Sequence, residues 1–292
     1  MGDNTIIVIL GPTAVGKTAA SISMARSIGT QIISFDSRQC YRELNIGVAK
    51  PAPEELSAVR HYFISSHSIR EEVNAALFAD LARGWAADIF RQSPAAVMVG
   101  GTGLYLRAFL EGLDEIPPVD PAIRRRLRED YECNGLAWLQ EELRSKDPAF
   151  YAAGERLNPQ RLLRALEVRL STGRSILDFR RGAPRKLPFA VRKIGLELPK
   201  EELHRRIQDR VDQMLSQGLV DEVRALVPYR NHNALQTVGY KEIFAYLDGQ
   251  CSLDEAVARI KTNTRQYAKR QLTWFRRDPA ITWTHPEKFP YL

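Results

Sequence analysis

Long apolar runs are missing from this 292-residue sequence. The one strongly apolar stretch near the N-terminus, Ile6 to Leu10, is too short for the core of a signal peptide and lacks a basic flank. No stretch approaches the roughly 20 apolar residues that a membrane-spanning helix needs. We therefore expect a soluble, cytoplasmic protein with no membrane partner.

Cysteine is also scarce, and its three copies, Cys40, Cys133 and Cys251, lie far apart. Such spacing argues against a thiolate metal site, and it is typical of a chain from a reducing compartment. The chain has no internal repeat and no low-complexity tract. Its length favours one large core that carries a smaller insertion or appendage.

Excess charge is absent from most of the chain and concentrated in one segment. Residues 117–195 contain 17 Lys and Arg against 10 Asp and Glu, which accounts for the whole net charge of +7. A local basic excess is the electrostatic footprint of a nucleic-acid-binding surface. An Arg-rich helical surface that serves solubility alone is the alternative.

Predicted strands and helices alternate in the first hundred residues. Buried strands are predicted over residues 5–10, 31–35, 61–65 and 95–99, with helices over 17–28 and 74–90. This alternation predicts an α/β fold, a parallel sheet flanked by helices. Another strand, over 191–198, precedes helices predicted over 201–217, 220–226, 241–247 and 252–277; Ser252 and Glu255 form a capping box at the start of the last.

Three prolines within residues 116–121 interrupt this alternation, because proline continues neither a helix nor a central strand. An Arg-rich segment with a helical pattern follows, to about residue 172. We predict a catalytic core formed by residues 1–116 and 191–292, and a basic helical insertion domain over residues 117–190.

A phosphate-binding loop is present in full. Residues 11–18, GPTAVGKT, match the pattern G-x-x-x-x-G-K-[ST] between a predicted strand and a predicted helix. The glycines let backbone N–H groups face phosphate oxygens, Lys17 supplies a cation, and the Thr18 hydroxyl can ligate Mg²⁺ as cofactor. The pyrophosphate- or nucleotide-binding residues predicted here are Gly11, Pro12, Thr13, Ala14, Val15, Gly16, Lys17 and Thr18.

The buried strand predicted over residues 95–99 does not end in an acidic residue that could position a metal ion. ATP-dependent phosphoryl transfer needs such a residue, but residues 95–101 end in two glycines. The second strand does end in an acid, Asp36, and the polar residues after it suit a second substrate. The pattern disfavours a motor or switch NTPase, while a small-metabolite kinase remains an alternative on the loop alone.

Six segments, taken in order, resemble the bacterial tRNA dimethylallyltransferases, also called tRNA isopentenyltransferases. These segments are GPTAVGKT, FDSRQCYRELNIGVAKP, GGTGLYLRAFLEGL, NPQRLLRALEV, TVGYKEI and KRQLTWFRR, between residues 6 and 277. The resemblance implies a P-loop fold whose loop holds the pyrophosphate of dimethylallyl pyrophosphate, and transfer of a dimethylallyl group to N6 of adenosine 37 in tRNA. An adenylate isopentenyltransferase, which prenylates a free nucleotide, would not need the basic insertion.

The resemblance also implies roles for individual residues. Asp36 matches the base that accepts the N6 proton, with Lys17 and Thr13 at the leaving pyrophosphate. The alternative for Asp36 is a helix cap or a hydrogen bond to a water ligand of Mg²⁺. Arg224 is a further pyrophosphate candidate. The implied tRNA contacts are Asp36, Ser37, Arg38, Gln39, Thr102, Arg124, Gln160, Arg161, Leu162, Leu163, Arg164 and Lys241.

Simpler explanations stay open for part of this tRNA surface. Thr102 also suits a plain glycine-rich helix entry, and the arginines of residues 160–164 also suit an ordinary solvated helix face. The last predicted helix is basic and carries Tyr267, Trp274 and Phe275, which fit either RNA contact or packing. A monomer is the default for the family.

Overall fold

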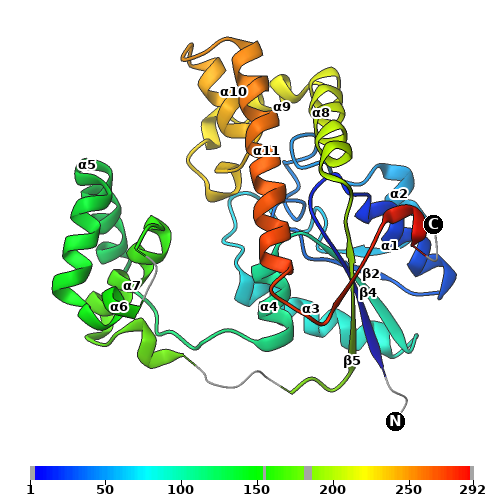
Figure 1. Ribbon diagram of the computed structural model, residues 1–292, viewed down its shortest axis with the longest axis horizontal. Helices are drawn as coiled ribbons and strands as arrows, with labels where there is room; N and C mark the ends of the chain where they lie inside the picture. The colour runs from blue at the N-terminus through cyan, green and yellow to red at the C-terminus, as the bar shows by residue number, and fades with distance from the viewer. Residues whose placement is uncertain (1–3, 154–155, 181–185, 290–292) are drawn as a thin grey trace. The chain divides into compact units, whose positions relative to one another are not determined.

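The computed structural model describes residues 4–153, 156–180 and 186–289. Its contacts divide the chain into two compact units, one formed by Met1–Gly112 with Lys186–Leu292 and the other by Leu113–Arg185. Figure 1 locates the elements of both units along the chain.

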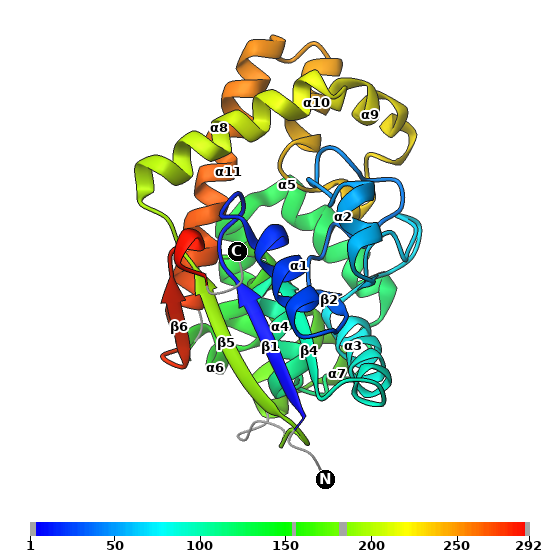
Figure 2. The same ribbon diagram turned by 90° about the vertical axis from the view of Figure 1, so that its right-hand side faces the viewer.

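The larger unit is built on a parallel sheet, which Figure 2 shows with its strands side by side. Within the described residues the sheet has six strands in the order β3-β2-β4-β1-β5-β6, and every neighbouring pair is parallel. The strands are β1 (Thr5–Leu10), β2 (Ile32–Ser34), β3 (His61–Tyr62), β4 (Ala95–Gly100), β5 (Ala190–Leu196) and β6 (Ile281–Thr284). The predicted α/β fold with a parallel sheet is confirmed.

The larger unit also contains eight helices among the described residues, and only some of them cover the faces of the sheet. The eight are α1 (Lys17–Ser27), α2 (Pro53–Ala58), α3 (Ala75–Phe90), α4 (Gly103–Glu111), α8 (Lys200–Ser216), α9 (Leu219–Ala225), α10 (Tyr240–Leu247) and α11 (Leu253–Phe275), with 3₁₀ turns at Val227–Tyr229, Asn233–Leu235 and Pro286–Lys288. Among the described residues, none of these helices combines the length and the apolar character needed to cross a membrane.

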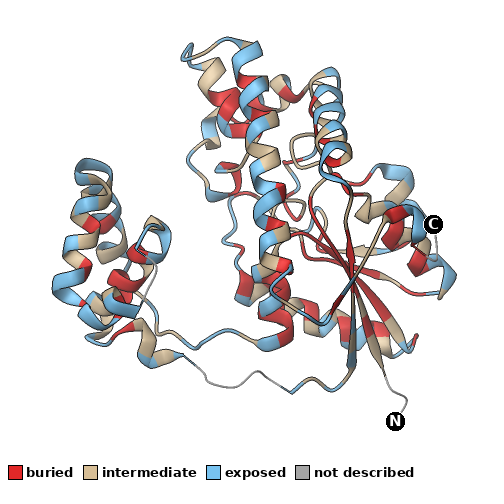
Figure 3. Cartoon of the chain, viewed as in Figure 1, coloured by how far each residue is buried: buried red, intermediate tan, exposed pale blue. Residues whose placement is uncertain are grey.

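The central strand β1 shows why the sheet residues are so apolar. Ile6 and Val8 belong to the hydrophobic cluster that includes residues of α3 and α4, whereas Ile9 belongs to the cluster on the α1 side. All three are fully buried, and Figure 3 shows burial concentrated in the strands of this sheet. A strand covered on both faces must be apolar throughout, so the local sequence alone predicts it well.

Two strands differ from the predicted pattern for identifiable reasons. The strand predicted over residues 61–65 ends at Tyr62, because Phe63 and Ser65 have φ angles of 64° and 50°, which a strand does not accommodate. The pattern also does not predict β6, whose four residues pair with Lys193–Leu196 of β5. Such a short strand carries too little periodicity to be recognised before its partner is known.

A side-chain cap begins α11 where the sequence predicts it. The Ser252 hydroxyl accepts from the Glu255 N–H (3.2 Å), and the Glu255 carboxylate accepts from the Ser252 N–H (2.8 Å), as the capping box requires. The Asn74 side chain accepts from two N–H groups at the start of α3. These local contacts stabilise helix ends independently of the tertiary structure.

The smaller unit is helical and has its own core. It contains α5 (Pro121–Lys146), α6 (Pro148–Ala153), α7 (Pro159–Thr172) and a 3₁₀ turn (Ile176–Phe179). Gly135, with a φ of 75°, interrupts α5, so this segment is two helices joined at a kink. Asn158 caps α7, and its side chain accepts from the Gln160 N–H (3.1 Å). Leucines of α5 and α7 pack together in a separate hydrophobic cluster.

Candidate active site

The phosphate-binding loop joins β1 to α1 and has the predicted conformation of an anion cradle. Gly11 and Gly16 have φ angles of 146° and 103°, which residues with a side chain rarely adopt. A side chain at Gly11 would also approach the Leu196 carbonyl oxygen to 2.5 Å. The loop therefore needs glycine at both positions, and it leads directly into the N-terminus of α1, where anions are favoured.

Two basic side chains contact this loop, one from the loop itself and one from α8. The Lys17 ammonium donates to the Pro12 carbonyl (2.7 Å), and the Arg210 guanidinium, from α8, donates to the Thr13 hydroxyl (3.3 Å). Burial, and then repulsion from Arg210, lower the pKa of Lys17 to about 7, although the Asp36 carboxylate opposes the shift. Burial also lowers the pKa of Arg210. Two cations held in this way favour binding of an anion between them.

Asp36 follows β2 at the carboxyl edge of the sheet. Its Oδ1 accepts from the backbone N–H groups of Arg38 (2.8 Å) and Gln39 (3.2 Å). Among the described residues no hydrogen bond involves its Oδ2. One oxygen of the carboxylate thus caps a turn, and the other remains available to a ligand. The capping role and a proton-accepting role are compatible, because each uses a different oxygen.

Contacts between strand ends hold this edge together. The carboxyl ends of β1, β2 and β4 are adjacent, since Leu10 is paired with Gly100 and Ser34 with Val99. The Thr102 hydroxyl accepts from the Ser37 N–H (3.1 Å), which ties the end of β4 to the Asp36 turn. Ligands of parallel α/β sheets bind at such an edge.

Gln271, a buried side chain of α11, connects the phosphate-binding loop to the residue that follows β4. Its Oε1 accepts from the Thr13 N–H (2.8 Å), and its Nε2 donates to the Gly101 carbonyl (3.0 Å). Neither Gln271 nor Arg210 is predicted from the sequence as a site residue. Both lie in segments predicted to be helical, but no local motif distinguishes them from their neighbours.

A cavity of about 440 Å³ brings these groups together. Its lining includes Lys17, Thr18, Asp36, Gln39, Arg210 and Tyr267. Burial, and then the nearby Asp36 carboxylate, raise the pKa of Tyr267 to about 12, so its phenol stays neutral and can donate a hydrogen bond. A phosphate-binding loop, an available carboxylate and a hydroxyl donor therefore face one space.

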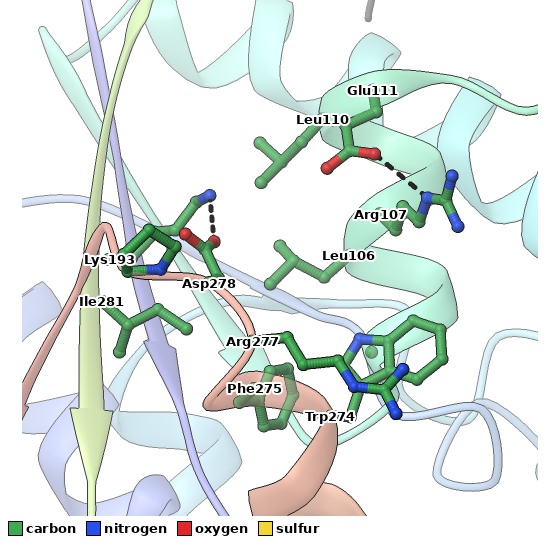
Figure 4. Close-up of a pocket in the computed structure, with 12 residues that line it drawn as sticks. Leu106, Arg107, Leu110, Glu111, Lys193, Trp274, Phe275, Arg277, Asp278 and Ile281 are labelled. Carbon is green, nitrogen blue, oxygen red and sulfur yellow. Dashed lines mark hydrogen bonds and ion pairs between the residues drawn. The ribbon is translucent and has the colours of Figure 1, made fainter. Parts of the chain in front are cut away.

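A second cavity of similar volume lies beside α4 and the end of α11 (Figure 4). Its cations are largely neutralised, because Arg107 pairs with Glu111 (3.0 Å) and Lys193 with Asp278 (2.5 Å). It has no part of the phosphate-binding loop in its lining. The first cavity is therefore the better candidate for an anionic substrate.

Some predicted residues lie outside the first cavity. Arg224 is exposed on α9, where it pairs with Asp221, and the structure does not bring it to the phosphate-binding loop. Arg210, from the neighbouring helix, contacts the loop instead. Arg38 donates to the Asn233 carbonyl (3.0 Å), and Lys241 is exposed on α10.

In the smaller unit, the predicted tRNA residues divide into two groups. Gln160 and Arg161 are exposed, and Arg124 and Arg164 each lie 3.4 Å from one carboxylate oxygen of the buried Glu167. Leu162 and Leu163 are buried in the core of the unit, so their side chains are not available to RNA, contrary to the prediction. The segment NPQRLLRALEV, which resembles the family as a whole, includes core positions as well as surface positions.

Comparison with known proteins identifies the family. The model of the IPP transferase family matches residues 39–278. The tRNA dimethylallyltransferase of Cytophaga hutchinsonii is 45% identical over 281 residues, which is 96% of this chain and 92% of that protein. The one from Christiangramia forsetii is 46% identical over 280 residues, or 96% and 93% of the two chains.

Solved structures agree. The tRNA isopentenylpyrophosphate transferase of Bacillus halodurans is 37% identical and has a TM-score of 0.71, covering 97% of this chain and 90% of that one. A eukaryotic dimethylallyltransferase, solved acting on tRNA, is 26% identical with a TM-score of 0.79, covering 97% and 75%. Together with the phosphate-binding loop and the carboxylate that face one cavity, these similarities show that the chain belongs to the IPP transferase family.

Proposed function

We propose that this chain transfers a dimethylallyl group from dimethylallyl pyrophosphate to N6 of adenosine 37 in tRNA, giving N6-dimethylallyladenosine and pyrophosphate. The observation that carries the proposal is that the phosphate-binding loop and the Asp36 carboxylate face one cavity. An allylic pyrophosphate needs an anion-binding site for its leaving group, and an amine nucleophile needs a proton acceptor. The tRNA dimethylallyltransferases named above support tRNA as the acceptor.

The leaving group is stabilised by the loop. As the bond between the allylic carbon and oxygen breaks, negative charge grows on pyrophosphate, and Lys17, Thr13, Arg210 and the loop N–H groups lie where they would hold it. Preorganised positive charge of this kind lowers the barrier to ionisation because it needs no rearrangement during the reaction. This is the role that we assign to Lys17 and Thr13.

Thr18 is the protein ligand that we propose for Mg²⁺. The site fits this ion, because Mg²⁺ bound to a pyrophosphate needs only one or two protein ligands and keeps several waters. No cluster of three His, Cys, Asp or Glu side chains that would form a full protein cage occurs in the described part of the chain. When bound, Mg²⁺ supplies further positive charge to the pyrophosphate oxygens.

Asp36 is the proposed base. As the new bond forms between the allylic carbon and N6, the Oδ2 of Asp36 accepts one N6 proton, while Oδ1 keeps its two backbone hydrogen bonds. Adenosine 37 would enter the cavity as a base turned out of the anticodon loop, which costs only a few kcal/mol because loop bases are already partly unstacked.

We infer that the smaller unit binds the anticodon stem-loop of the tRNA. Arg124, Gln160, Arg161 and Arg164 place polar and cationic groups at its surface, in the segment that carries the excess positive charge. Glu167 lies 3.4 Å from each of two of these guanidinium groups, Arg124 and Arg164, and so holds them close to one another. We further propose a monomer that acts in the cytoplasm, which size-exclusion chromatography and cell fractionation would test.

The decisive assay follows the label of labelled dimethylallyl pyrophosphate. Purified protein and Mg²⁺ are mixed with an unmodified anticodon stem-loop bearing adenosine 37, and parallel reactions contain AMP, ATP or a stem-loop with guanosine at that position. We expect label on the adenosine stem-loop alone. Label on AMP would indicate an adenylate isopentenyltransferase, and consumption of ATP without transfer would indicate a kinase.

Lys17 is expected to take up a proton when pyrophosphate binds to the loop. The pKa of Lys17 is about 7 in the free protein, and a bound anion raises it. Affinity should therefore be highest below about pH 7 and fall as the pH rises through the pKa of the bound state. At about pH 8, calorimetry in buffers of different ionisation enthalpy should detect roughly one more proton taken up by the wild type than by Lys17→Met.

Protonation of pyrophosphate itself contributes equally in both proteins, so the difference isolates Lys17. The exposed Lys200 provides a matched control, and Lys200→Met should take up as many protons as the wild type. Equal uptake by Lys17→Met and the wild type would show that Lys17 is already charged in the free protein.

A further inference from the structure

Glu222, on α9, contacts residues that line the first cavity. It is half-buried, and its Oε2 accepts from the backbone N–H groups of Asn45 (3.1 Å) and Ile46 (2.8 Å). Its Oε1 accepts from the Gly47 N–H (3.0 Å) and from the Tyr240 hydroxyl (2.6 Å). Three consecutive backbone amides and one phenol thus engage both oxygens, an arrangement that requires an anion.

Tyr240, at the start of α10, packs against the same segment. A side chain at Gly47 would place its Cβ 2.6 Å from the Tyr240 ring, so the backbone can lie there only because residue 47 is glycine. Tyr240 is itself fully buried. Residues 45–47 are therefore held from α9 through Glu222 and from α10 through Tyr240.

The segment held by Glu222 continues into the cavity lining, where Ile46, Val48 and Ala49 provide apolar surface. Ala49 has a φ of 47°, which is unfavourable for a residue with a side chain and persists only where neighbours hold it. Gln39 does so, because its side-chain amide donates to the carbonyls of Val48 (3.2 Å) and Ala49 (2.9 Å).

Gln39 also connects this wall to the base, since its backbone N–H donates to Asp36 Oδ1 (3.2 Å). A continuous set of contacts therefore runs from Glu222 through residues 45–49 to Gln39 and Asp36. Loss of the Glu222 carboxylate would leave three amides without an acceptor and release the apolar wall and the Asp36 turn together.

We propose that Glu222 is a positioning residue that makes adenine N6, and not water, the nucleophile toward the allylic carbon. The inference rests on the proposed function. In the competing reaction, water oxygen bonds to the allylic carbon, the bond from that carbon to pyrophosphate breaks, and a water proton passes to solvent, giving dimethylallyl alcohol and pyrophosphate. A wall held tightly against the dimethylallyl group excludes this water.

The test measures the ratio of dimethylallyl alcohol to prenylated stem-loop in Glu222→Gln. Glutamine has nearly the same size, but its NH₂ group faces N–H donors and cannot accept from them. We expect turnover to fall about 10- to 100-fold, as for a displaced catalytic group, and the ratio to rise about tenfold. The ratio does not depend on the amount of folded enzyme, so a merely destabilised variant leaves it unchanged.

Asp221→Asn is the matched control on the same helix, because Asp221 is exposed and pairs with Arg224; its ratio should equal that of the wild type. Tyr240→Phe removes one of the four donors to Glu222, so it should raise the ratio of alcohol to prenylated stem-loop less than Glu222→Gln does. If Glu222→Gln does not fold, Tyr240→Phe provides the test in its place. An unchanged ratio in the folded Glu222 variant, or in Tyr240→Phe if that variant fails, would overturn the inference. A wild type that prenylates no stem-loop would refute the proposed function instead.

Discussion

Asp36→Asn is expected to lower the turnover of dimethylallyl transfer about 100- to 10,000-fold, the range that general-base catalysis contributes. Asparagine keeps an oxygen at the position of Oδ1, so it can still accept from the N–H groups of Arg38 and Gln39 and preserve the turn. It removes the negative charge and the proton acceptor at Oδ2. The substitution therefore separates the capping role of Asp36 from its chemical role.

Steady-state kinetics with the stem-loop, together with anisotropy measurements of its binding, provide the test. The affinity for tRNA and the melting temperature should stay close to those of the wild type. Asp88→Asn, at an exposed position of α3 where Asp88 pairs with Arg91, is the control and should leave turnover unchanged. Turnover that survives in Asp36→Asn would show that Asp36 acts as a cap and not as the base.

Removal of the smaller unit is expected to weaken binding of the tRNA stem-loop by more than about 100-fold and to leave pyrophosphate binding intact. This unit contains 14 of the 17 Lys and Arg residues of the basic segment 117–195, including Arg124, Arg161 and Arg164, and phosphate contacts dominate the affinity of proteins for nucleic acids. The cations that contact the phosphate-binding loop, Lys17 and Arg210, belong to the larger unit.

The insertion domain predicted from the sequence covers residues 117–190, but the structure indicates better limits for a deletion. Leu187 packs against the main core of the larger unit, so we expect a deletion of residues 113–185, closed by a short flexible linker, to retain that packing. Anisotropy with a labelled stem-loop and calorimetry with pyrophosphate measure the two affinities. Unchanged tRNA affinity in a folded deletion variant would refute the proposed role of the unit.

The predictions that succeed from sequence rest on short-range physics. The phosphate-binding loop is recognised because its glycines, Lys17 and Thr18 are contiguous and their conformations are set locally. The cap at Ser252 acts on an N–H group three residues away. The central strands are recognised because burial on both faces demands a continuous apolar run.

The predictions that fail rest on long-range contacts. Arg224 is a predicted pyrophosphate ligand, but the structure leaves it exposed beside Asp221 and brings Arg210 to the loop, which the sequence does not indicate. Gln271 meets Thr13 across 258 positions of the chain, and no local pattern reports such a contact. Leu162 and Leu163 are assigned to tRNA because a matched segment does not distinguish the surface of α7 from its buried face.

The sequence by itself determined the phosphate-binding loop, the parallel α/β architecture and the resemblance to an enzyme family, because each depends on residues that are adjacent or regularly spaced. Only the tertiary structure decided which side chains complete the cavity. Arg210, Gln271 and Glu222 reach the loop, the end of β4 and the cavity wall from helices distant in the chain. Their roles depend on packing between elements, which is set by the whole chain and not by any local segment.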